Sequence, residues 1–315
     1  MNRKSDSFTH TVRYEYGNRT GTIATKVGTG TTWAVPLEFM NDIPAATSGS
    51  GRIYVDTYNG STLVGTKYTG FTATVPTTSD CNPKLSVTLE DITGADDIYG
   101  SPVKGISKIK ITVTATKAYR SPIASYKITA NGATYTSSSA TTGVLQKAGA
   151  SRVTVTVKDK RGRTGTYSYD MNVQEYTAPT ISKLSVLRCD SNGIENDQGE
   201  YCQVTFSANV SSMSNKNTAT YRLRYKRSNA EDWTVVQLTS LNNVYTVTDY
   251  THIFAATGNS SFDVDVTATD RHNTSSRPTS ASTAFTLINF GSNGNSLRFG
   301  GVAAGENLFQ NDLKF

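Results

Sequence analysis

The segment Val153–Asp159 (VTVTVKD) alternates apolar and polar residues, and Val264–Asp270 (VDVTATD) repeats this pattern further along the chain. Strict alternation is typical of a β-strand with one buried face and one face in water. Two further pairs recur in the same order: Lys84–Val87 (KLSV) with Lys183–Val186 (KLSV), and Ala124–Ile128 (ASYKI) with Ala219–Leu223 (ATYRL). These ordered matches indicate a repeat of roughly 100 residues, the size of an immunoglobulin-like sandwich.

The composition favours the same fold class. Of 315 residues, 36% are hydrophobic and only 18% charged, with 17 tyrosines and 25 glycines, a mixture typical of strands and turns. Turn signals such as Asn59-Gly60 and Asn131-Gly132 separate the alternating runs. The sequence therefore predicts an all-β chain of three tandem immunoglobulin-like or fibronectin III-like β-sandwiches with a short C-terminal β-hairpin tail.

Prolines mark the expected boundaries between repeats. The stretch from Pro76 to Pro83 separates the first repeat from the second, and Pro179 opens the third. We predict sandwiches over residues 1–79, 80–178 and 179–289, followed by a tail over residues 290–315. The first repeat is a candidate for a sandwich that is incomplete at its N-terminal end.

The charge distribution argues against nucleic-acid and membrane partners. The chain has 31 basic and 25 acidic residues, a net charge of +6, without a block of like charges. Its densest basic cluster, Lys158–Arg163, is interpreted as the polar tip of a hairpin. No stretch is apolar enough for a membrane helix, and the N-terminus lacks the apolar run of a secretory signal, so we expect synthesis in a cytoplasm.

An odd number of cysteines, Cys81, Cys189 and Cys202, favours reduced thiols, with a Cys189–Cys202 disulfide across a hairpin as the alternative. The histidines His10 and His252 and a third at position 272 fall in unrelated contexts, and no nucleophile, phosphate-loop or metalloprotease motif is present. We therefore expect no catalytic residues and no cofactor.

One loop gathers oxygen ligands of the kind that calcium prefers: Asp190, Asn192, Glu195 and Asp197. Its glycine stands at the fourth position, which breaks the EF-hand pattern, and the same residue types form ordinary β-turns. We expect a structured loop rather than a metal site, and keep calcium as the alternative.

Two tryptophans are candidates for core positions or for platforms on which a sugar ring stacks. Trp233 precedes a strand-like run and is expected in the core of the third repeat. For Trp33, in the segment Gly30–Pro36, both interpretations stay open, so it is the candidate sugar-binding residue.

An ordered series of segments carries a family resemblance: Thr9–Asn18, Gly21–Ala24, Trp33–Ile43, Val157–Arg163, Arg188–Asp190 with Gly199–Tyr201, and Phe299–Ala303. The chain resembles the siphovirus-type minor structural proteins with immunoglobulin-like repeats, found in tails and baseplates of phages of Gram-positive bacteria. The resemblance implies a non-enzymatic virion component, made in the bacterial host cytoplasm. It would serve in the tail, baseplate or tail fibre as a spacer or adhesion arm toward the host surface.

Two other functions stay open. One is a carbohydrate-binding adhesion module that recognises host cell-wall polysaccharide through Trp33, tyrosines and loop amides. The other is a capsid decoration protein, although a tail position is favoured over the capsid.

The C-terminal tail is too short for a domain and too apolar to stay solvated alone. We expect it to attach the chain to other virion proteins or to join copies of itself, with a trimer favoured. The alternative is that it folds back on the third sandwich. The residues expected to make these contacts are Leu297, Phe299, Leu308, Phe309 and Phe315.

Overall fold

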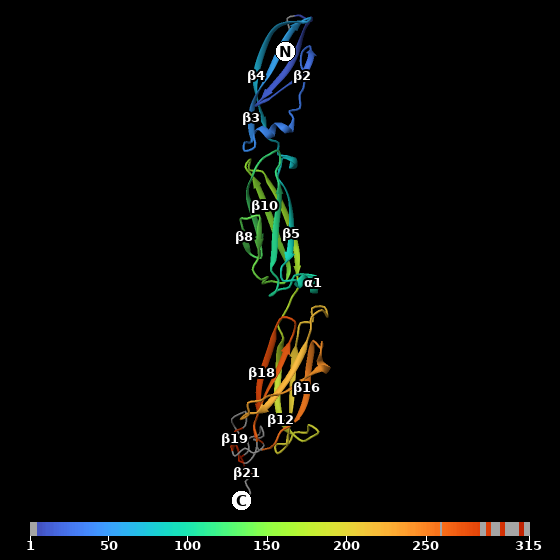
Figure 1. Ribbon diagram of the computed structural model, residues 1–315, viewed down its shortest axis with the longest axis vertical. Helices are drawn as coiled ribbons and strands as arrows, with labels where there is room; N and C mark the ends of the chain where they lie inside the picture. The colour runs from blue at the N-terminus through green and yellow to red at the C-terminus, as the bar shows by residue number, and fades with distance from the viewer. Residues whose placement is uncertain (1–4, 259, 284–287, 291–296, 300–308, 312–315) are drawn as a thin grey trace. The chain divides into compact units, whose positions relative to one another are not determined.

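The computed structural model describes residues 5–258 and 260–283 and three short strands, residues 288–290, 297–299 and 309–311. The chain forms two compact units, residues 1–96 with 101–173 and residues 97–100 with 174–315. Nearly every regular element in them is a β-strand, as the arrows of Figure 1 show, so the all-β prediction is confirmed. Among the described residues, every helix is too short or too polar to span a lipid bilayer.

The first repeat contains one four-stranded antiparallel sheet in the order β2-β1-β3-β4 (Figure 1, blue). Glycines with positive φ, Gly17 and Gly60, make the tight turns between β1 and β2 and between β3 and β4, as the Asn59-Gly60 signal predicts. Its elements are β1 (Phe8–Tyr16), β2 (Arg19–Val27), the 3-10 helix η1 (Leu37–Asp42), β3 (Ser48–Asn59) and β4 (Thr62–Thr74).

Aromatic rings form the core over one face of this sheet. Trp33 and Phe39, from the segment between β2 and β3, pack on Tyr14 and Tyr16 of β1 and Phe71 of β4. Glycines on the facing strands make room for them. A Cβ on Gly51 would lie 2.4 Å from the Phe71 ring, and one on Gly49 would overlap the Tyr16 hydroxyl.

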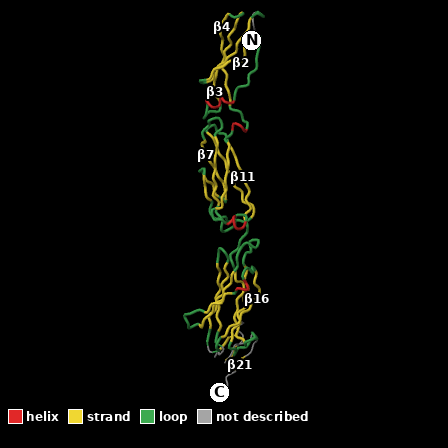
Figure 2. The backbone as a smooth tube through the Cα atoms, turned by 45° about the vertical axis from the view of Figure 1, so that its right-hand side comes forward, coloured by secondary structure: helices red, strands yellow, loops and turns green. Residues whose placement is uncertain are grey.

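The second repeat packs a sheet of order β5-β6-β9 against one of order β11-β10-β7-β8; Figure 2 labels β7 and β11 among its yellow strands. Alternate residues of β6 and β10 are buried between the sheets, as the alternation predicts: Ile109, Ile111, Val113, Val153, Val155 and Val157. The elements are η2 (Ser79–Cys81), β5 (Lys84–Asp91), α1 (Ala95–Tyr99), β6 (Ile109–Thr116), β7 (Ile123–Ala130), β8 (Ala133–Tyr135), β9 (Ser139–Thr141), β10 (Gly149–Asp159) and β11 (Thr164–Val173).

The third repeat again has two sheets, of order β12-β13-β16 and β15-β14-β17-β18. Its core is rich in aromatic residues, with Phe206, Tyr221, Phe254 and Phe262 all buried. The elements are β12 (Thr180–Cys189), β13 (Tyr201–Asn209), β14 (Thr220–Arg227), β15 (Thr234–Gln237), η3 (Thr239–Leu241), β16 (Thr246–Ala255), β17 (Phe262–Thr269) and β18 (Thr274–Ala281).

The two later repeats share a strand register. Ile128 of β7 pairs with Val155 of β10, and the corresponding residues of the next repeat, Leu223 of β14 and Val266 of β17, also pair. The sequence matches therefore describe equivalent strands. The proposed boundaries at residues 79 and 178 stay predictions.

Three short strands represent the tail: β19 (Ile288–Phe290), β20 (Leu297–Phe299) and β21 (Phe309–Asn311). β19 pairs antiparallel with β20, as expected for a hairpin, and β21 pairs parallel to β20. Of the predicted contact residues, Leu297 is the first and Phe299 the last residue of β20, and Phe309 is the first residue of β21. Leu308 and Phe315 lie outside the described residues.

Candidate functional site

The first sheet carries a polar, aromatic face on the side opposite the Trp33 cluster. Partners directly across a sheet point to the same side. Arg13 stands across from Tyr54 and Tyr54 across from Tyr68, while Glu15 faces Arg52 in the next row. Asp56, two positions from Tyr54, shares that side. We call Arg13, Glu15, Arg52, Tyr54, Asp56 and Tyr68 the tyrosine face.

Charge-assisted hydrogen bonds fix part of this face. Arg13 donates from Nε to Asp56 Oδ2 at 2.6 Å and from Nη2 to Oδ1 at 3.1 Å, and Thr66 Oγ1 donates to Oδ1 at 2.7 Å. The hydrogen bond from Arg13 holds the pKa of Asp56 below its usual value. Tyr54 donates its hydroxyl to Glu15 Oε2 at 2.6 Å. These side chains are therefore held in place without a ligand.

The remaining members of the face, Arg52 and Tyr68, lie toward solvent. Tyr68 is 64% exposed and its ring centroid lies 5.6 Å from that of Tyr54. The Arg52 guanidinium carbon lies 5.1 Å from the Tyr68 centroid. A hydrogen bond with Tyr54 and the nearby Tyr68 and Glu15 raise the pKa of Arg52.

A shallow hollow adjoins these side chains. It measures about 390 Å³ and is lined by Glu15, Gly17, Ser50, Gly51 and Arg52. Two of these, Glu15 and Arg52, belong to the tyrosine face. The face therefore combines an exposed ring, a cation, a carboxylate and a concave surface.

The candidate Trp33 is partly buried on the other side of the sheet. Its ring stacks on Tyr14 with centroids 4.9 Å apart and meets Phe39 and Phe71 edge-on. One ring face is thus occupied by Tyr14. Beside this cluster, an apolar cavity of about 230 Å³ lies between η1 and the end of β4. The role of Trp33 in sugar binding stays a prediction.

The prediction that Trp233 fills the core of the third repeat is wrong. Trp233 is half-buried just before β15, and cations lie over its ring: Arg224 at 4.5 Å and Lys226 at 5.3 Å from the centroid. The core is filled instead by Phe206, Tyr221 and their neighbours. Trp233 is thus covered by charged stems rather than by the opposite sheet.

The basic cluster Lys158–Arg163 contains a buried arginine that the sequence did not reveal. Arg161 is 5% exposed and donates to the carbonyl oxygens of Ala118 at 3.1 Å, Tyr119 at 2.8 Å and Ile43 at 3.2 Å, and also to that of Met40. Burial lowers its pKa. The turn itself is held by Asp159, whose Oδ1 accepts the N–H groups of Arg161 and Arg163. Arg161 thus joins loops of the first and second repeats.

The equivalent turn of the third repeat is built on Asp270. Its Oδ1 accepts the backbone N–H groups of His272 and Asn273, and its Oδ2 accepts from the Tyr176 hydroxyl at 3.0 Å and from Asn217 Nδ2 at 3.1 Å. Burial raises the pKa of Tyr176 to about 12 and lowers the pKa of His272. The repeated aspartate therefore has a turn-forming role in both repeats.

The acidic loop is organised by its own side chains. Asp190 Oδ1 accepts the N–H groups of Asn192 at 2.8 Å and Ile194 at 3.0 Å, as in an Asx-turn. Glu195 forms an isolated bridge with Cys189, and Asn192, Glu195 and the partly buried Asp197 follow the same loop. Within the described ranges, no group of three or more His, Cys, Asp or Glu residues is placed to hold a metal ion.

The cysteines are buried and free. Cys189 and Cys202 occupy adjacent rungs of the β12–β13 pair, because Cys202 stands across from Arg188 and Cys189 across from Tyr201. Burial raises the pKa of both thiols, which favours the protonated form.

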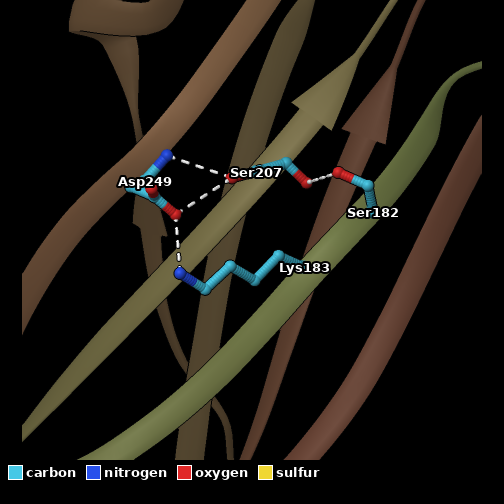
Figure 3. A network of polar contacts seen from close by, with 4 residues as sticks. All are labelled: Ser182, Lys183, Ser207 and Asp249. Carbon is cyan, nitrogen blue, oxygen red and sulfur yellow. Dashed lines mark hydrogen bonds and ion pairs between the residues drawn. The ribbon is translucent and has the colours of Figure 1, made fainter.

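A polar network joins β12, β13 and β16 (Figure 3). Lys183 Nζ donates to Asp249 Oδ1 at 2.8 Å, and Ser207 Oγ donates to the same oxygen at 3.3 Å and accepts the Asp249 N–H at 3.0 Å. Ser182 Oγ donates to the Ser207 carbonyl at 3.3 Å. Strand register shifts at these positions, and Asp249 has a φ of +47°. The network therefore holds two β-bulges in place.

This network does not have the geometry of a nucleophile and its base. Ser207 contacts the carboxylate of Asp249, whose pKa is lowered by the hydrogen bond from Lys183. A carboxylate with a lowered pKa is a weaker proton acceptor than an ordinary one. The arrangement thus supports the strand geometry at the two bulges.

A family model described as "Siphovirus protein of unknown function (DUF859)" matches residues 1–286. The chain belongs to this family. The resemblance to siphovirus proteins with immunoglobulin-like repeats is confirmed at that level, and the place of this Siphovirus protein in a tail or baseplate stays a prediction. A search of the curated proteins finds no significant match.

Several solved structures are distantly similar to this Siphovirus protein. A 1.5-MDa bacterial ice-binding adhesin is 16% identical, with a TM-score of 0.37 and coverage of 90% of this chain and 87% of that one. An adhesin of an Antarctic bacterium is 17% identical, with a TM-score of 0.34 and coverage of 93% and 71%. The FN1-FN3 domains of chicken CNTN1 are 10% identical, with a TM-score of 0.26 and coverage of 87% and 89%. These values describe distant likeness, and the functions of those proteins do not transfer.

Proposed function

We propose that this Siphovirus protein is a non-enzymatic structural component of the virion, placed in the tail, baseplate or tail fibre. There it acts as a spacer or adhesion arm toward the host surface. Family membership supports a phage protein, and the tandem β-domains support a structural role. The observation that carries the proposal is that polar groups buried in the repeats hold turns and loops together.

Arg188 is the clearest case. It is 8% exposed, and its guanidinium donates to the carbonyl oxygens of Ala256 at 2.8 Å and Ser282 at 3.0 and 3.1 Å, and also to that of Ser260. Its carbon lies 5.8 Å from the Phe262 ring centroid. A charge used in this way fixes the end of a sandwich and is not free to act on a substrate.

Similar reasoning applies to the repeated turn aspartates. Asp159 and Asp270 are 2% and 6% exposed and accept backbone N–H groups of their own turns. Function must be argued from a site rather than from a fold. Asp159 and Asp270 thus have a structural role in their turns, which supports the spacer function.

Labelling of intact particles tests the proposal. Antibodies against the purified chain, detected with gold in electron micrographs, should bind purified phage particles at the tail. Label over the head would favour a capsid decoration protein instead. Absence of the chain from particles, measured by mass spectrometry, would refute a virion role.

A second function, carbohydrate binding, is favoured by one observation. The tyrosine face presents the exposed Tyr68 beside Arg52 and a hollow of about 390 Å³. An adhesion arm that recognises host cell-wall polysaccharide would use such a surface. Many copies on a particle would strengthen weak single contacts through avidity.

A further inference from the structure

We propose that the tyrosine face is a glycan-binding site, in which a sugar ring lies on Tyr68 and its hydroxyl groups bond to Arg52 and Glu15. The inference rests on the proposed adhesive role and gives that role a site. It places the sugar platform on Tyr68, which is 64% exposed with Arg52 beside its ring, rather than on Trp33, whose ring is packed against Tyr14, Phe39 and Phe71 on the other side of the same sheet.

The aromatic part of the site is already in position. Tyr68 is 64% exposed on β4, and the neighbouring Tyr54 ring limits its movement from one side. The C–H groups of a pyranose form an apolar surface that an exposed aromatic ring can cover. Tyrosine supplies such a surface with few rotatable bonds, so little conformational entropy is lost on binding.

The polar part of the site also fits hydroxyl groups. A guanidinium has five N–H donors, and the contacts of Arg52 with Tyr54 and with the Tyr68 ring leave donors for a ligand. Glu15 accepts the Tyr54 hydroxyl through Oε2, and a carboxylate has further lone pairs to accept sugar hydroxyls. An arginine and a carboxylate side by side can thus donate to one hydroxyl and accept from the next.

Size and charge favour a glycan over a protein partner. The hollow of about 390 Å³ lies within the range of small-ligand pockets. Arg13 and Asp56 neutralise each other in a two-hydrogen-bond pair, which leaves one cation and one carboxylate beside the ring. The centre of a protein interface is depleted in charged residues, whereas Arg52 and Glu15 both belong to this face.

Binding of the full chain to protein-free cell walls of the host bacterium tests the site. We expect the wild-type chain to bind, and Tyr68→Ala and Arg52→Ala each to weaken binding about tenfold or more. Tyr68→Phe, which keeps the ring, should stay within about threefold of wild type. Tyr169→Ala removes a tyrosine that is 49% exposed in the second repeat and should bind as wild type does. Thermal melts of each variant show whether the fold is retained.

Two results would overturn the proposal: no binding by the wild-type chain, or unchanged binding by folded Tyr68→Ala and Arg52→Ala. Binding that needs wall protein would assign the face to a protein partner. A failure of the virion role can be distinguished from a failure of the glycan site. If the chain is absent from phage particles, mass spectrometry of the particles shows it, and that measurement does not depend on the binding variants.

Discussion

At the scale of single residues, the stability of the repeats depends on a few buried polar side chains. The guanidinium of Arg188 donates hydrogen bonds to several backbone carbonyl groups at one end of the third repeat. Replacement by alanine leaves those carbonyls without a partner, so we expect Arg188→Ala to lower the unfolding free energy of that repeat by about 2 to 4 kcal/mol. Calorimetry of the full chain measures the change.

Arg152→Ala is the matched control. Arg152 forms a two-hydrogen-bond pair with Asp170, but both side chains are more than half exposed. Exposed pairs contribute about 1 kcal/mol or less, so this variant should melt close to wild type. Equal destabilisation by the two substitutions would contradict the structural role assigned to Arg188.

Titration of a buried tyrosine gives a second prediction at this scale. Tyr221 donates its hydroxyl to the Val244 carbonyl at 2.8 Å, and burial raises its pKa to about 12. The folded chain therefore keeps a proton that the unfolded chain loses near pH ~10. The stabilisation is complete below pH ~10 and is lost as pH rises toward about 12.

Melting of the third repeat between pH ~10 and ~12 measures this effect. The melting temperature of the wild-type chain should fall steeply over this pH window, and that of Tyr221→Phe should fall less. Part of the slope should remain, because burial also raises the pKa of Tyr176 to about 12. An identical slope in the variant would show that Tyr221 does not contribute.

At the scale of elements, the first sheet depends on glycines beneath aromatic rings. A Cβ on Gly51 would lie 2.4 Å from the Phe71 ring and 2.7 Å from the Glu15 carbonyl oxygen. We expect Gly51→Ala to destabilise the first repeat by about 1 to 3 kcal/mol through overpacking. Gly65→Ala, on β4 with nothing within 4 Å of its Cβ, should be neutral or slightly stabilising. Denaturant unfolding of both variants measures the difference in stability. Equal unfolding midpoints would contradict the packing role of Gly51.

Sequence patterns predicted the elements better than the sites. Alternation in Val153–Asp159 and its repeat predicted β10 and β17. In β10 the polar residues between the valines are only partly buried, whereas in β17 the polar Asp265 and Thr267 are buried as well, which the alternation did not predict. The burial of Arg161 could not be predicted, since its partners are carbonyls far away in sequence, and a basic turn looks the same whether buried or solvated. The prediction for Trp233 was wrong for a similar reason, since the groups that cover its ring could not be read from the sequence. Cations of β14 cover the ring, and the opposing sheet does not.

The tyrosine face carried only a weak signal. Arg52, Tyr54 and Asp56 alternate along one strand, which predicts a shared side. Their meeting with Arg13 and Tyr68 depends on the pairing of three strands, and one shift of register would place these residues on opposite sides.

At the scale of the whole molecule, the tail over residues 290–315 is expected to join copies of the chain. Truncation after Asn289 should yield a folded monomer, whereas the full chain should form an oligomer, with a trimer favoured. Analytical ultracentrifugation of both proteins measures the difference. An oligomeric state that truncation leaves unchanged would contradict the role of the tail.

A structural part of the phage tail should be visible in the particle. Electron cryo-microscopy can compare particles of wild-type phage with particles of phage that lack this chain. We expect difference density at the tail, with unchanged heads. Identical tails in the two particles, or difference density on the capsid, would contradict a place in the tail.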